Sequence, residues 1–457
     1  HIHILGICGT FMGGIAAIAK QAGYRVTGCD ANVYPPMSTQ LEAQGIELIS
    51  GFDAGQLDLK PDVFVIGNVV SRGNPLMEAI LDAGASYISG PQWLAENVLH
   101  GKWVLAVAGT HGKTTTSAML AWLLEDAGLN PSFLIGGVPN NFGISARLTD
   151  DPFFVIEADE YDTAFFDKRS KFLHYLPELV VINNIEFDHA DIYNSLEEIK
   201  LSFRRLTQII PHNGLALVNA DDPNCLDVVK GAPCPVKTVG FSDSSNIRIL
   251  DVETSTDGSH FTLEGTRYYV PMIGEFNIRN AAMAIAAAQF AGLNVKQLAD
   301  SMSRFEGVAR RQEVKGVVNG ISVVDDFAHH PTAIKQAILG LRQRYPESRI
   351  WAIFEPRSNT TRRNIFQNEL ALSLATADFP VVAAVDHPDK VALEERLDLT
   401  KLSSDLSALG KDALIGGHAQ EIVSAVCKKA QPGDVILVMS NGGFEGIHAK
   451  LLEALNA

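Results

Sequence analysis

The sequence is poor in cysteine and in positive charge. Its five cysteines among 457 residues are scattered, odd in number and include no C-x-x-C pair. We therefore expect no disulfide framework and no cysteine-based zinc site. The 37 basic residues are outnumbered by 53 acidic ones, which leaves a net charge of −16. A field of that sign repels phosphate backbones and anionic lipid, so we expect no general binding to nucleic acid.

The sequence also lacks a segment with the features of a membrane span. The uncharged stretch closest to this type, Asn280 to Val295, is rich in alanine but carries Asn280, Gln289 and Asn294. A spanning helix needs about 20 consecutive apolar residues. The first ten residues, HIHILGICGT, are typical of a strand and lack the basic and apolar regions of a secretory signal. We therefore expect a cytoplasmic protein that makes no contact with membranes.

What the sequence does contain is an alternation of short β-branched runs with helical periods. This alternation, with 46% hydrophobic residues, is typical of α/β domains with parallel sheets. We expect three domains, at 1–99, 100–312 and 313–457, and a small antiparallel sheet between Ile247 and Val270. Ligands of parallel sheets bind beyond the carboxyl ends of the strands. Polar residues occupy those ends here: Asp30, Asn68, Glu157, Asn183, Asp325, Glu355, Asp386 and Ser440.

A glycine-rich segment, Gly109-Thr-His-Gly-Lys-Thr-Thr-Thr116, follows an apolar run and precedes the helical run SAMLAWLLEDAG. Glycines let consecutive N–H groups face an anion, Lys113 neutralises it, and Thr114 places a hydroxyl where Mg²⁺ would bind. The segment departs from the usual phosphate-binding pattern because Val107 stands at the first glycine position. It indicates nucleotide binding, and an incidental glycine turn is the alternative.

Acidic residues follow two later apolar runs. Glu157 and Asp159 end FFVIEADEYD, which we take as the first strand after the glycine-rich segment. An acid at that place would hold the metal that neutralises phosphates, and a solvated acidic turn is the alternative. The segment NNIEFDHAD groups three acids with His189. Because Mg²⁺ prefers oxygen ligands, residue type alone favours a structural or exposed role for this histidine.

A second glycine loop, Gly6-Ile-Cys-Gly-Thr-Phe-Met-Gly13, joins the first strand to a helix, and Asp30 ends the next strand. The spacing resembles a dinucleotide fingerprint, but Cys8 stands at the second glycine position. A glycine loop at a helix N-terminus suits a pyrophosphate. We therefore expect a phosphorylated ligand here and favour NAD less than other ligands of this class.

Two segments of the third domain carry polar groups at strand ends. Asp325-Asp-Phe-Ala-His-His-Pro331 places two acids near two histidines. It is consistent with metal ligation, with polar substrate contacts, or with an Asp-capped helix beginning at Pro331. Glu355-Pro-Arg-Ser-Asn-Thr-Thr-Arg-Arg363 carries three arginines, which suit a carboxylate ligand but also an ordinary basic turn.

Two further segments have both a structural and a binding interpretation. Phe276-Asn-Ile-Arg-Asn-Ala281 opens the alanine-rich helix, where residue type favours a capping role for Asn277 and Asn280 over contact with a base. Ser440-Asn-Gly-Gly-Phe444 is a glycine-rich strand exit, which is also consistent with a purely structural turn.

In chain order, seven stretches resemble the Mur ligases: GICGTFMGG, AGTHGKTTT, EADEYD, NNIEFDHAD, GEFNIRNAA, GVARRQE and DDFAHHPTAI. The resemblance implies three α/β domains, with Rossmann-like N- and C-terminal domains around a P-loop ATPase domain. One departure concerns the subfamily, because Glu355-Pro-Arg-Ser-Asn-Thr replaces the QPHRYTR type of stretch of the L-alanine-adding enzymes. That segment, with YPPMS, SGPQWL, AFFDKRSKF and MSNGGF, is similar to the branch that joins a recovered murein tripeptide to UDP-N-acetylmuramate.

The resemblance implies an ATP- and Mg²⁺-dependent amide synthesis in peptidoglycan recycling, with small-molecule substrates and a monomer or weak homodimer. Matched motifs assign ATP to Gly109, Thr110, His111, Gly112, Lys113, Thr114, Thr115, Asn277, Asn280, Arg311 and Asp326. They assign magnesium to Thr114, Glu157 and His189, the UDP-sugar to Gly9, Thr10 and Asp30, and the peptide to His329, Arg357, Asn359 and Ser440. Lys113, Glu157 and His189 are the expected catalytic residues.

Three rival interpretations stay open at this point. The first is ligation of free L-alanine to the same UDP-sugar. The second is an NAD-dependent dehydrogenase, which explains the N-terminal glycine loop but leaves Lys113 and Glu157 without a role. The third is a non-catalytic UDP-sugar sensor.

Overall fold

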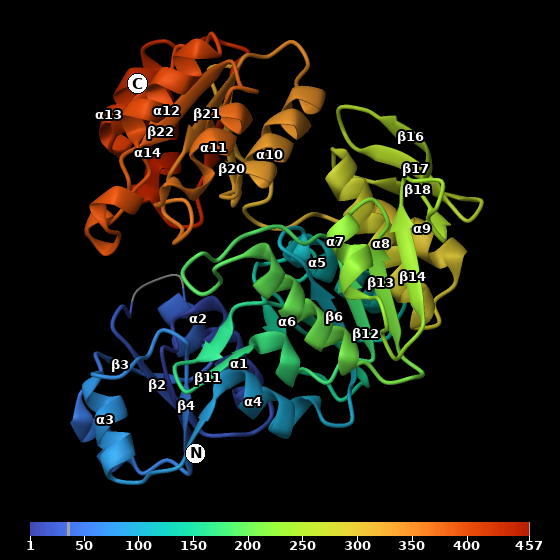
Figure 1. Cartoon of the computed structure of the whole chain (residues 1–457), viewed down its shortest axis with the longest axis vertical. Coiled ribbons are helices and arrows are strands. Elements are labelled where there is room, and N and C mark those ends of the chain that lie inside the picture. The colour runs from blue at the N-terminus through green and yellow to red at the C-terminus, as the bar shows by residue number, and fades with distance from the viewer. Residues whose placement is uncertain (34–36, 457) are drawn as a thin grey trace.

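Three large sheets, each with helices beside it, organise the chain (Figure 1). The structure is a computed structural model and describes residues 1–33 and 37–456. Part of the YPPMS stretch therefore lies outside the described residues. The expected α/β class is confirmed, because nearly all strands of the large sheets run parallel.

The first sheet is a five-stranded parallel sheet in the order β3-β2-β1-β4-β5. Its strands are β1 (Ile2–Leu5), β2 (Val26–Asp30), β3 (Glu47–Ser50), β4 (Val63–Ile66) and β5 (Tyr87–Ser89). The accompanying helices are α1 (Thr10–Gln21), α2 (Met37–Glu42), α3 (Pro75–Asp82) and α4 (Gly90–Leu94). All four residues of β1 are buried, as expected for a central strand covered on both faces. The order is Rossmann-like.

The central sheet has eight strands in the order β15-β14-β13-β12-β6-β9-β7-β8. They are β6 (Trp103–Ala108), β7 (Ser132–Leu134), β8 (Ala146–Arg147), β9 (Phe153–Ala158), β12 (Leu179–Ile182), β13 (Leu215–Asn219), β14 (Val236–Gly240) and β15 (Ile247–Arg248). Its helices are α5 (Lys113–Asp126), α6 (Leu196–Gln208), α7 (Pro223–Val228), α8 (Glu275–Phe290) and α9 (Val295–Ser303). Two short strands, β7 and β8, separate α5 from β9, so the expectation that the Glu157 strand directly follows the glycine loop is wrong in sequence order. In space β9 still pairs with β6.

Two small antiparallel sheets accompany the central one. β16 (Leu250–Thr254), β17 (Ser259–Leu263) and β18 (Thr266–Val270) form a three-stranded sheet, which confirms the antiparallel unit expected there. Ile247 and Arg248 belong instead to β15 of the large sheet. β10 (Asp162–Ala164) and β11 (Asp167–Ser170) form a hairpin.

The third sheet has the order β19-β20-β24-β21-β22-β23, and only the pairing of β19 with β20 is antiparallel. Its strands are β19 (Glu313–Val318), β20 (Ile321–Asp326), β21 (Ile350–Phe354), β22 (Phe379–Ala383), β23 (Leu414–Gly417) and β24 (Val435–Met439). The helices are α10 (Pro331–Arg344), α11 (Gln367–Leu374), α12 (Leu399–Ala408), α13 (Ala419–Cys427) and α14 (Ile447–Asn456).

The three parts are joined in different ways. One apolar cluster runs from the first sheet into the central part, because Met12 and Ile15 of α1 belong to the same buried cluster as Leu134 and Ala146. The third sheet buries its two faces in two clusters of its own. We infer that apolar packing fastens the first part to the central one, whereas polar contacts dominate the seam with the third.

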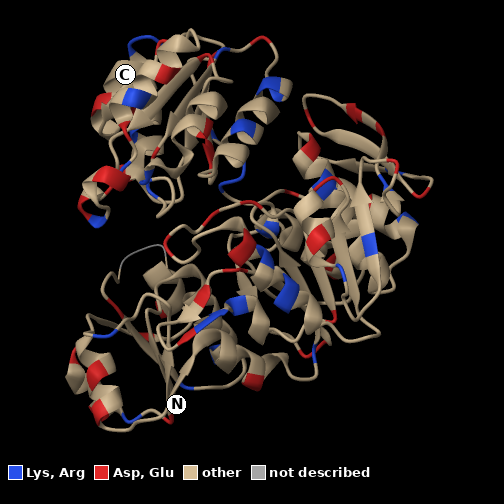
Figure 2. Cartoon of the chain, viewed as in Figure 1, with Lys and Arg blue, Asp and Glu red and all other residues tan. Residues whose placement is uncertain are grey.

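Charge is spread over all three parts. In the view of Figure 2, basic and acidic residues are both scattered over the helices and loops of each part. Within residues 1–33 and 37–456, no helix combines the length and hydropathy needed to cross a bilayer.

Candidate active site

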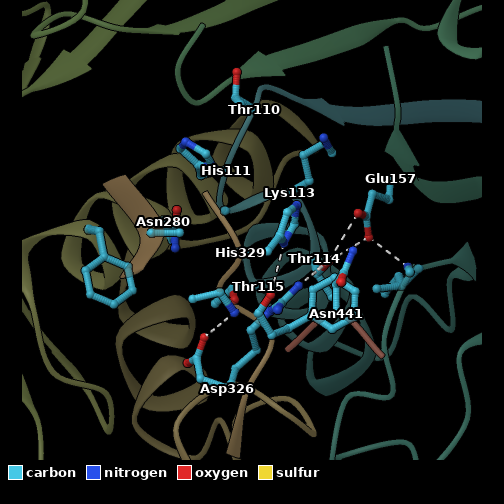
Figure 3. A pocket seen from close by; sticks show the side chains of 18 of the residues that line it. Thr110, His111, Lys113, Thr114, Thr115, Glu157, Asn280, Asp326, His329 and Asn441 are labelled. Carbon is cyan, nitrogen blue, oxygen red and sulfur yellow. Dashed lines mark hydrogen bonds between the residues drawn. The ribbon is translucent and has the colours of Figure 1, made fainter. Parts of the chain in front are cut away.

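A cavity of 430 Å³ lies where the three sheets' strand ends approach one another (Figure 3). It is lined by every predicted ATP residue except Gly109, namely Thr110, His111, Gly112, Lys113, Thr114, Thr115, Asn277, Asn280, Arg311 and Asp326, and also by Thr10, Glu157, His189 and His329. The N-terminal glycine loop thus reaches the cavity through Thr10, and the third part reaches it through Asp326 and His329. Side chains far apart in the sequence share one enclosed space.

The glycine-rich loop between β6 and α5 forms the floor of this cavity. Gly112 is the N-cap of α5 and adopts φ +79°, and Gly109 adopts φ +130°. A Cβ at Gly112 would lie 2.5 Å from Oδ1 of Asn280 and 3.0 Å from Nδ2 of Asn183. Glycine is therefore needed here both for the left-handed backbone and for the close approach of α8. The strand–loop–helix geometry is that of a phosphate-binding loop.

Glu157 is held tightly at the end of β9. Its carboxylate accepts the Thr114 hydroxyl at 3.0 and 3.1 Å and the Gly136 N–H at 2.7 Å. The guanidinium of Arg311, which arrives from the connector to the third part, donates to the same Thr114 hydroxyl at 3.3 Å. A hydroxyl and a carboxylate side by side are the oxygen donors that Mg²⁺ prefers.

A second group of charges surrounds Lys113. Its ammonium donates to Glu160 at 3.0 Å and lies 3.7 Å from Asp159. Burial lowers the pKa of Lys113, but the carboxylates of Glu160, Asp159 and Glu157 together raise it above its ordinary value. The lysine therefore stays charged, as a phosphate ligand requires. Glu160 has a 1% exposed side chain and was not a predicted site residue.

His189 faces Glu160 rather than Glu157. Its Nε2 lies 3.2 Å from Oε1 of Glu160. Burial lowers its pKa, but the hydrogen bond and charge of Glu160 outweigh burial and raise the pKa to about 9. His189 adopts φ +53°, an unfavourable conformation for a non-glycine residue that often marks a functional site. Ligand atoms of Asp159, Glu160 and His189 lie within 4.8 Å of one another. The predicted metal residues thus fall into two adjoining groups, one around Thr114 and Glu157 and one around His189.

Asn277 and Asn280 are not helix caps. The N-cap of α8 is Gly274, and both asparagines lie inside the first turns, where they are buried. Asn277 donates to the carbonyl of Ile273 at 2.9 Å, and Asn280 donates to Oδ1 of Asn277 at 3.4 Å. The capping interpretation is wrong because the helix starts earlier than the asparagines and turns them toward the cavity.

One of the three interpretations of the Asp325–Pro331 segment, an Asp-capped start of α10, is also wrong in one respect. The helix does begin at Pro331, but its N-cap is His330, whose Nδ1 accepts the N–H of Thr332. Asp326 instead accepts the N–H groups of Gln312 and Ala328 at 2.9 and 2.8 Å. It therefore braces the connector beside Arg311, and burial raises its pKa.

A smaller cavity of 270 Å³ adjoins the first at the seam with the third part. It is lined by His189, His329, Arg357, Asn359 and Asn441, among other residues. The other two arginines of the same turn are committed, because Arg362 donates to Asp386 at 3.1 Å and Arg363 pairs with Glu395. The closest acidic partners of Arg357 lie 3.8 and 3.9 Å away. Its guanidinium is the one of the three best placed for an external carboxylate.

Ser440 does not line either cavity. Its side chain is fully buried and its hydroxyl donates to Glu355 at 2.5 Å. The neighbouring Asn441 faces both cavities instead. A one-residue shift of this kind follows from the end of β24 at Met439, beyond which the alternation of side chains no longer holds.

The three residues predicted to bind the UDP-sugar differ in their position and contacts. Asp30 accepts the N–H of Cys8 at 3.0 Å and of Asn32 at 3.1 Å, so it braces the N-terminal glycine loop. Gly9 is the N-cap of α1. Of the three predicted residues, Thr10 alone lines the large cavity, and the other two shape the loop behind it.

Comparisons with known proteins agree with this arrangement. Three family models match in succession: the Mur ligase family catalytic domain at 1–101, the Mur ligase middle domain at 107–288, and the Mur ligase glutamate ligase domain at 310–442. A ligase of Escherichia coli K12, UDP-N-acetylmuramate–L-alanyl-γ-D-glutamyl-meso-2,6-diaminoheptandioate ligase, is 48% identical over 99% of this chain and 98% of its own length. The chain belongs to the Mur ligase family.

Two other Mur ligases can be compared with this chain by sequence identity and coverage. The crystal structure of a murein peptide ligase from Psychrobacter arcticus is 40% identical, has a TM-score of 0.77, and matches 100% of this chain and 98% of that chain. The UDP-N-acetylmuramate–L-alanine ligase of Burkholderia cenocepacia HI2424 is 33% identical over 99% of this chain and 97% of its own length. This Mur ligase is thus more similar to the peptide-adding relatives than to the alanine-adding one.

Proposed function

We propose that this Mur ligase joins the tripeptide L-alanyl-γ-D-glutamyl-meso-diaminopimelate to UDP-N-acetylmuramate, with cleavage of ATP, in cell-wall recycling in the cytoplasm. The observation that carries the proposal is the 48% identity over nearly the full length to a ligase of that name, against 33% to an L-alanine ligase. The cavity shared by three sheets supports it, because three substrates must meet there.

The chemistry proceeds in two steps. The lactyl carboxylate of the UDP-sugar attacks the γ-phosphorus of ATP, the bond to the β–γ bridging oxygen breaks, and an acyl phosphate and ADP form. The alanyl amine then attacks the acyl carbon, and the tetrahedral intermediate expels phosphate while the amine loses a proton. A carboxylate oxygen is a poor leaving group and phosphate is a good one, which is why the reaction consumes ATP.

We assign the electrostatic work of the first step to Lys113 and Arg311. Both are partly buried cations on the cavity wall, where charge on the transferring phosphoryl group is best stabilised. Thr114, Glu157 and His189, with Asp159 and Glu160, would hold Mg²⁺, which supplies further charge neutralisation on the phosphates. Gly109, Thr110, His111, Gly112 and Thr115 complete the phosphate cradle, and Asn277 and Asn280 lie where adenine would contact α8.

We assign the remaining substrates to the two outer parts. Gly9, Thr10 and Asp30 would position the UDP moiety at the N-terminus of α1. His329, Arg357 and Asn359 would bind the peptide in the smaller cavity. Ser440 would not contact the peptide but would position Glu355, to which it donates, and Asn441, which follows it in the chain. Contacts across the seam, such as Thr360 donating to Asp188 at 2.8 Å, would exclude water from the hydrolysable acyl phosphate.

A paired acceptor assay tests the proposal. Phosphate release is measured with UDP-N-acetylmuramate and ATP in the presence of either the tripeptide or free L-alanine. The tripeptide is expected to give the higher kcat/KM. A preference for L-alanine would overturn the substrate assignment in favour of the L-alanine ligase alternative. If neither amine gave phosphate release, ligation itself would be overturned.

Arg357→Ala gives an independent test of the peptide site. Its weakly paired guanidinium suits the carboxylates of the tripeptide, so the peptide KM is expected to rise about tenfold or more, with the ATP KM unchanged. Arg363→Ala, which removes an arginine already paired with Glu395, is the matched control. Equal peptide KM values in the two variants would contradict the assignment.

A further inference from the structure

A second cluster of metal-ligating side chains shares no residue with the group of Asp159, Glu160 and His189. It consists of His111 in that loop, Glu186 in the segment after β12, and His330 at the start of α10. Their ligand atoms lie within 4.8 Å of one another. Three segments separated by more than 70 residues meet here, and no role assigned above requires both histidines to face one carboxylate.

The two distances from the histidines to Glu186 fit tetrahedral coordination. Nε2 of His111 and Nδ1 of His330 each lie 3.5 Å from the same Oε2 of Glu186. In a tetrahedral zinc site with bonds of about 2.0–2.1 Å, neighbouring ligand atoms are about 3.3 Å apart. The two histidine–glutamate distances therefore need to shorten by only a few tenths of an ångström, and the two histidine nitrogens lie within 4.8 Å of each other.

The ring nitrogens are also in a state suited to ligation. Nε2 of His330 lies 3.1 Å from the carbonyl of Phe187. A proton on that nitrogen fixes the tautomer and leaves Nδ1 as the lone-pair atom, the arrangement usual for metal-bound histidine. Nδ1 accepts the N–H of Thr332 at 3.3 Å, a long hydrogen bond that a metal ion at this position would replace. Nε2 of His111 is buried and, among the described residues, has no hydrogen-bond partner. A buried unpartnered nitrogen is costly unless a ligand satisfies it.

Glu186 is oriented by a neighbour as well. Its Oε2 accepts the hydroxyl of Thr332 at 2.7 Å. Glu186 and His330 also line a cavity of 540 Å³ beside α10 and α11, which gives an ion a path from solvent. His111 lines the 430 Å³ cavity described above. The cluster thus stands between the two cavities.

We propose that His111, Glu186 and His330 bind one borderline-soft divalent cation, of which Zn²⁺ is the best fit. Two imidazoles and one carboxylate form a ligand set for zinc rather than for magnesium, whose preferred ligands are oxygens. The group of Asp159, Glu160 and His189 differs because two of its three members are carboxylates. A cation bound to His111 and His330 fastens the nucleotide loop directly to the third part of the chain.

Co²⁺ is the probe for the test, because its visible absorption reports tetrahedral coordination. The full chain is titrated with Co²⁺ in excess Mg²⁺, which occupies the oxygen-rich group but not the imidazole site. We expect one equivalent of tetrahedral Co²⁺, displaced by one equivalent of Zn²⁺. Absence of a tetrahedral band under these conditions would overturn the proposal.

Two variants locate the ion. His330→Asn keeps a good helix cap while removing the imidazole, and Glu186→Gln keeps an acceptor for Thr332 while removing the charge. Each is expected to weaken Co²⁺ binding by about 100-fold. His329→Asn, at the neighbouring histidine, and His189→Asn, in the oxygen-rich group, are the controls and are expected to retain the band. A band lost with His189→Asn but kept in the first two variants would place the ion in the other group and overturn the assignment.

A thermal measurement supplies a readout that does not depend on activity. Zn²⁺ is expected to raise the unfolding temperature of the wild type and of His189→Asn, with reversal by a chelator, because a ligand of the folded state stabilises it. The shift is expected to vanish in Glu186→Gln. An equal shift in Glu186→Gln would contradict the proposed site even if that variant folds normally.

Discussion

The chain contains two glycine loops that join a parallel strand to a helix, and they differ in the charged side chains around them. The loop after β6 holds Lys113 and Thr114 among three carboxylates and a guanidinium. The loop after β1 contains no charged residue and is braced by one acceptor, Asp30. In the proposed function, the same loop conformation would thus bind two different ligands. Only the loop that would handle a transferring phosphoryl group needs buried charge, whereas a phosphate that merely binds is satisfied by N–H groups.

The largest expected effect comes from removing the charge that distinguishes the two loops. Lys113→Ala should lower turnover by about 10²–10³-fold, because a partly buried donor to the transferring group is lost. Binding of the UDP-sugar, measured by calorimetry, should not change. Lys168→Ala, at an exposed lysine paired with Asp162, is the control. Retained ligation in Lys113→Ala would remove the distinction between the loops.

The next largest effect is a difference in the pH dependence of stability between the first sheet and the central sheet. His3 in β1 is buried, and burial, despite a hydrogen bond to Gln56, lowers its pKa to about 4. The unfolded histidine, with its ordinary pKa near 6.5, binds its proton first as pH falls. Stability of the first part is therefore complete above about pH 6.5, falls as pH drops, and is lower by about 3 kcal/mol at pH 4.

Hydrogen exchange checks this sign. Amides of β1 and β4 should exchange faster between pH 6.5 and 4, after correction for intrinsic rates, than amides of β6. His3→Gln should flatten the trend, and His212→Gln, at an exposed histidine, should not. An unchanged trend in His3→Gln would assign the acid sensitivity to another group.

Steric crowding at the nucleotide loop gives a third contrast. Gly112→Ala places a methyl group 2.5 Å from Oδ1 of Asn280 in a left-handed residue, so ATP affinity should fall about tenfold or more. Gly128→Ala has nearly the same φ of +81° and, within the described residues, nothing within 4 Å of the new Cβ. It should lose about 1 kcal/mol of stability and keep its ATP affinity. Equal ATP affinities would show that α8 yields to the methyl group.

The smallest effect is expected at the N-terminal loop. Gly6→Ala meets Cγ2 of Val69 at 2.7 Å, but Val69 is 69% exposed and can rotate away. UDP-sugar affinity should fall only a few-fold, with ATP affinity unchanged, as measured by calorimetry. Gly73→Ala, with φ +88° and open space among the described residues, is the control. A large loss of ATP affinity in Gly6→Ala would mean that the two loops are not independent.

Sequence reasoning predicted the α/β class, the antiparallel unit and both glycine loops, because these depend on local periodicity and on backbone conformations that glycine permits. Side chains just beyond a strand were harder. The sequence predicts Glu157 and Asp159 as acids at the end of one apolar run, and β9 ends between them at Ala158. The chain then turns, and Glu160 becomes the buried partner of Lys113. For the same reason Asn441, and not the predicted Ser440, lines the two cavities.

Helix starts were the second source of error. Asn277, Asn280 and Asp326 have side chains typical of caps, and residue type cannot tell a cap from a buried polar residue one turn further on. The orientation of Asn277 and Asn280 is set where α8 packs against α5, and that of Asp326 by its bonds to the N–H groups of Gln312 and Ala328. Contacts of this kind depend on tertiary structure and leave no local pattern.

The connector residues Arg310, Arg311 and Gln312 join the central part to the third. Arg310 and Gln312 both adopt left-handed backbone angles, with φ +61° and +52°, and Arg311 between them reaches Thr114. The strand that follows, β19, starts immediately at Glu313, so no flexible residues separate Gln312 from the third sheet. A swing of the third part about this connector would therefore move the guanidinium away from Thr114, and a fluorophore attached to the connector would report such a swing as a change in distance.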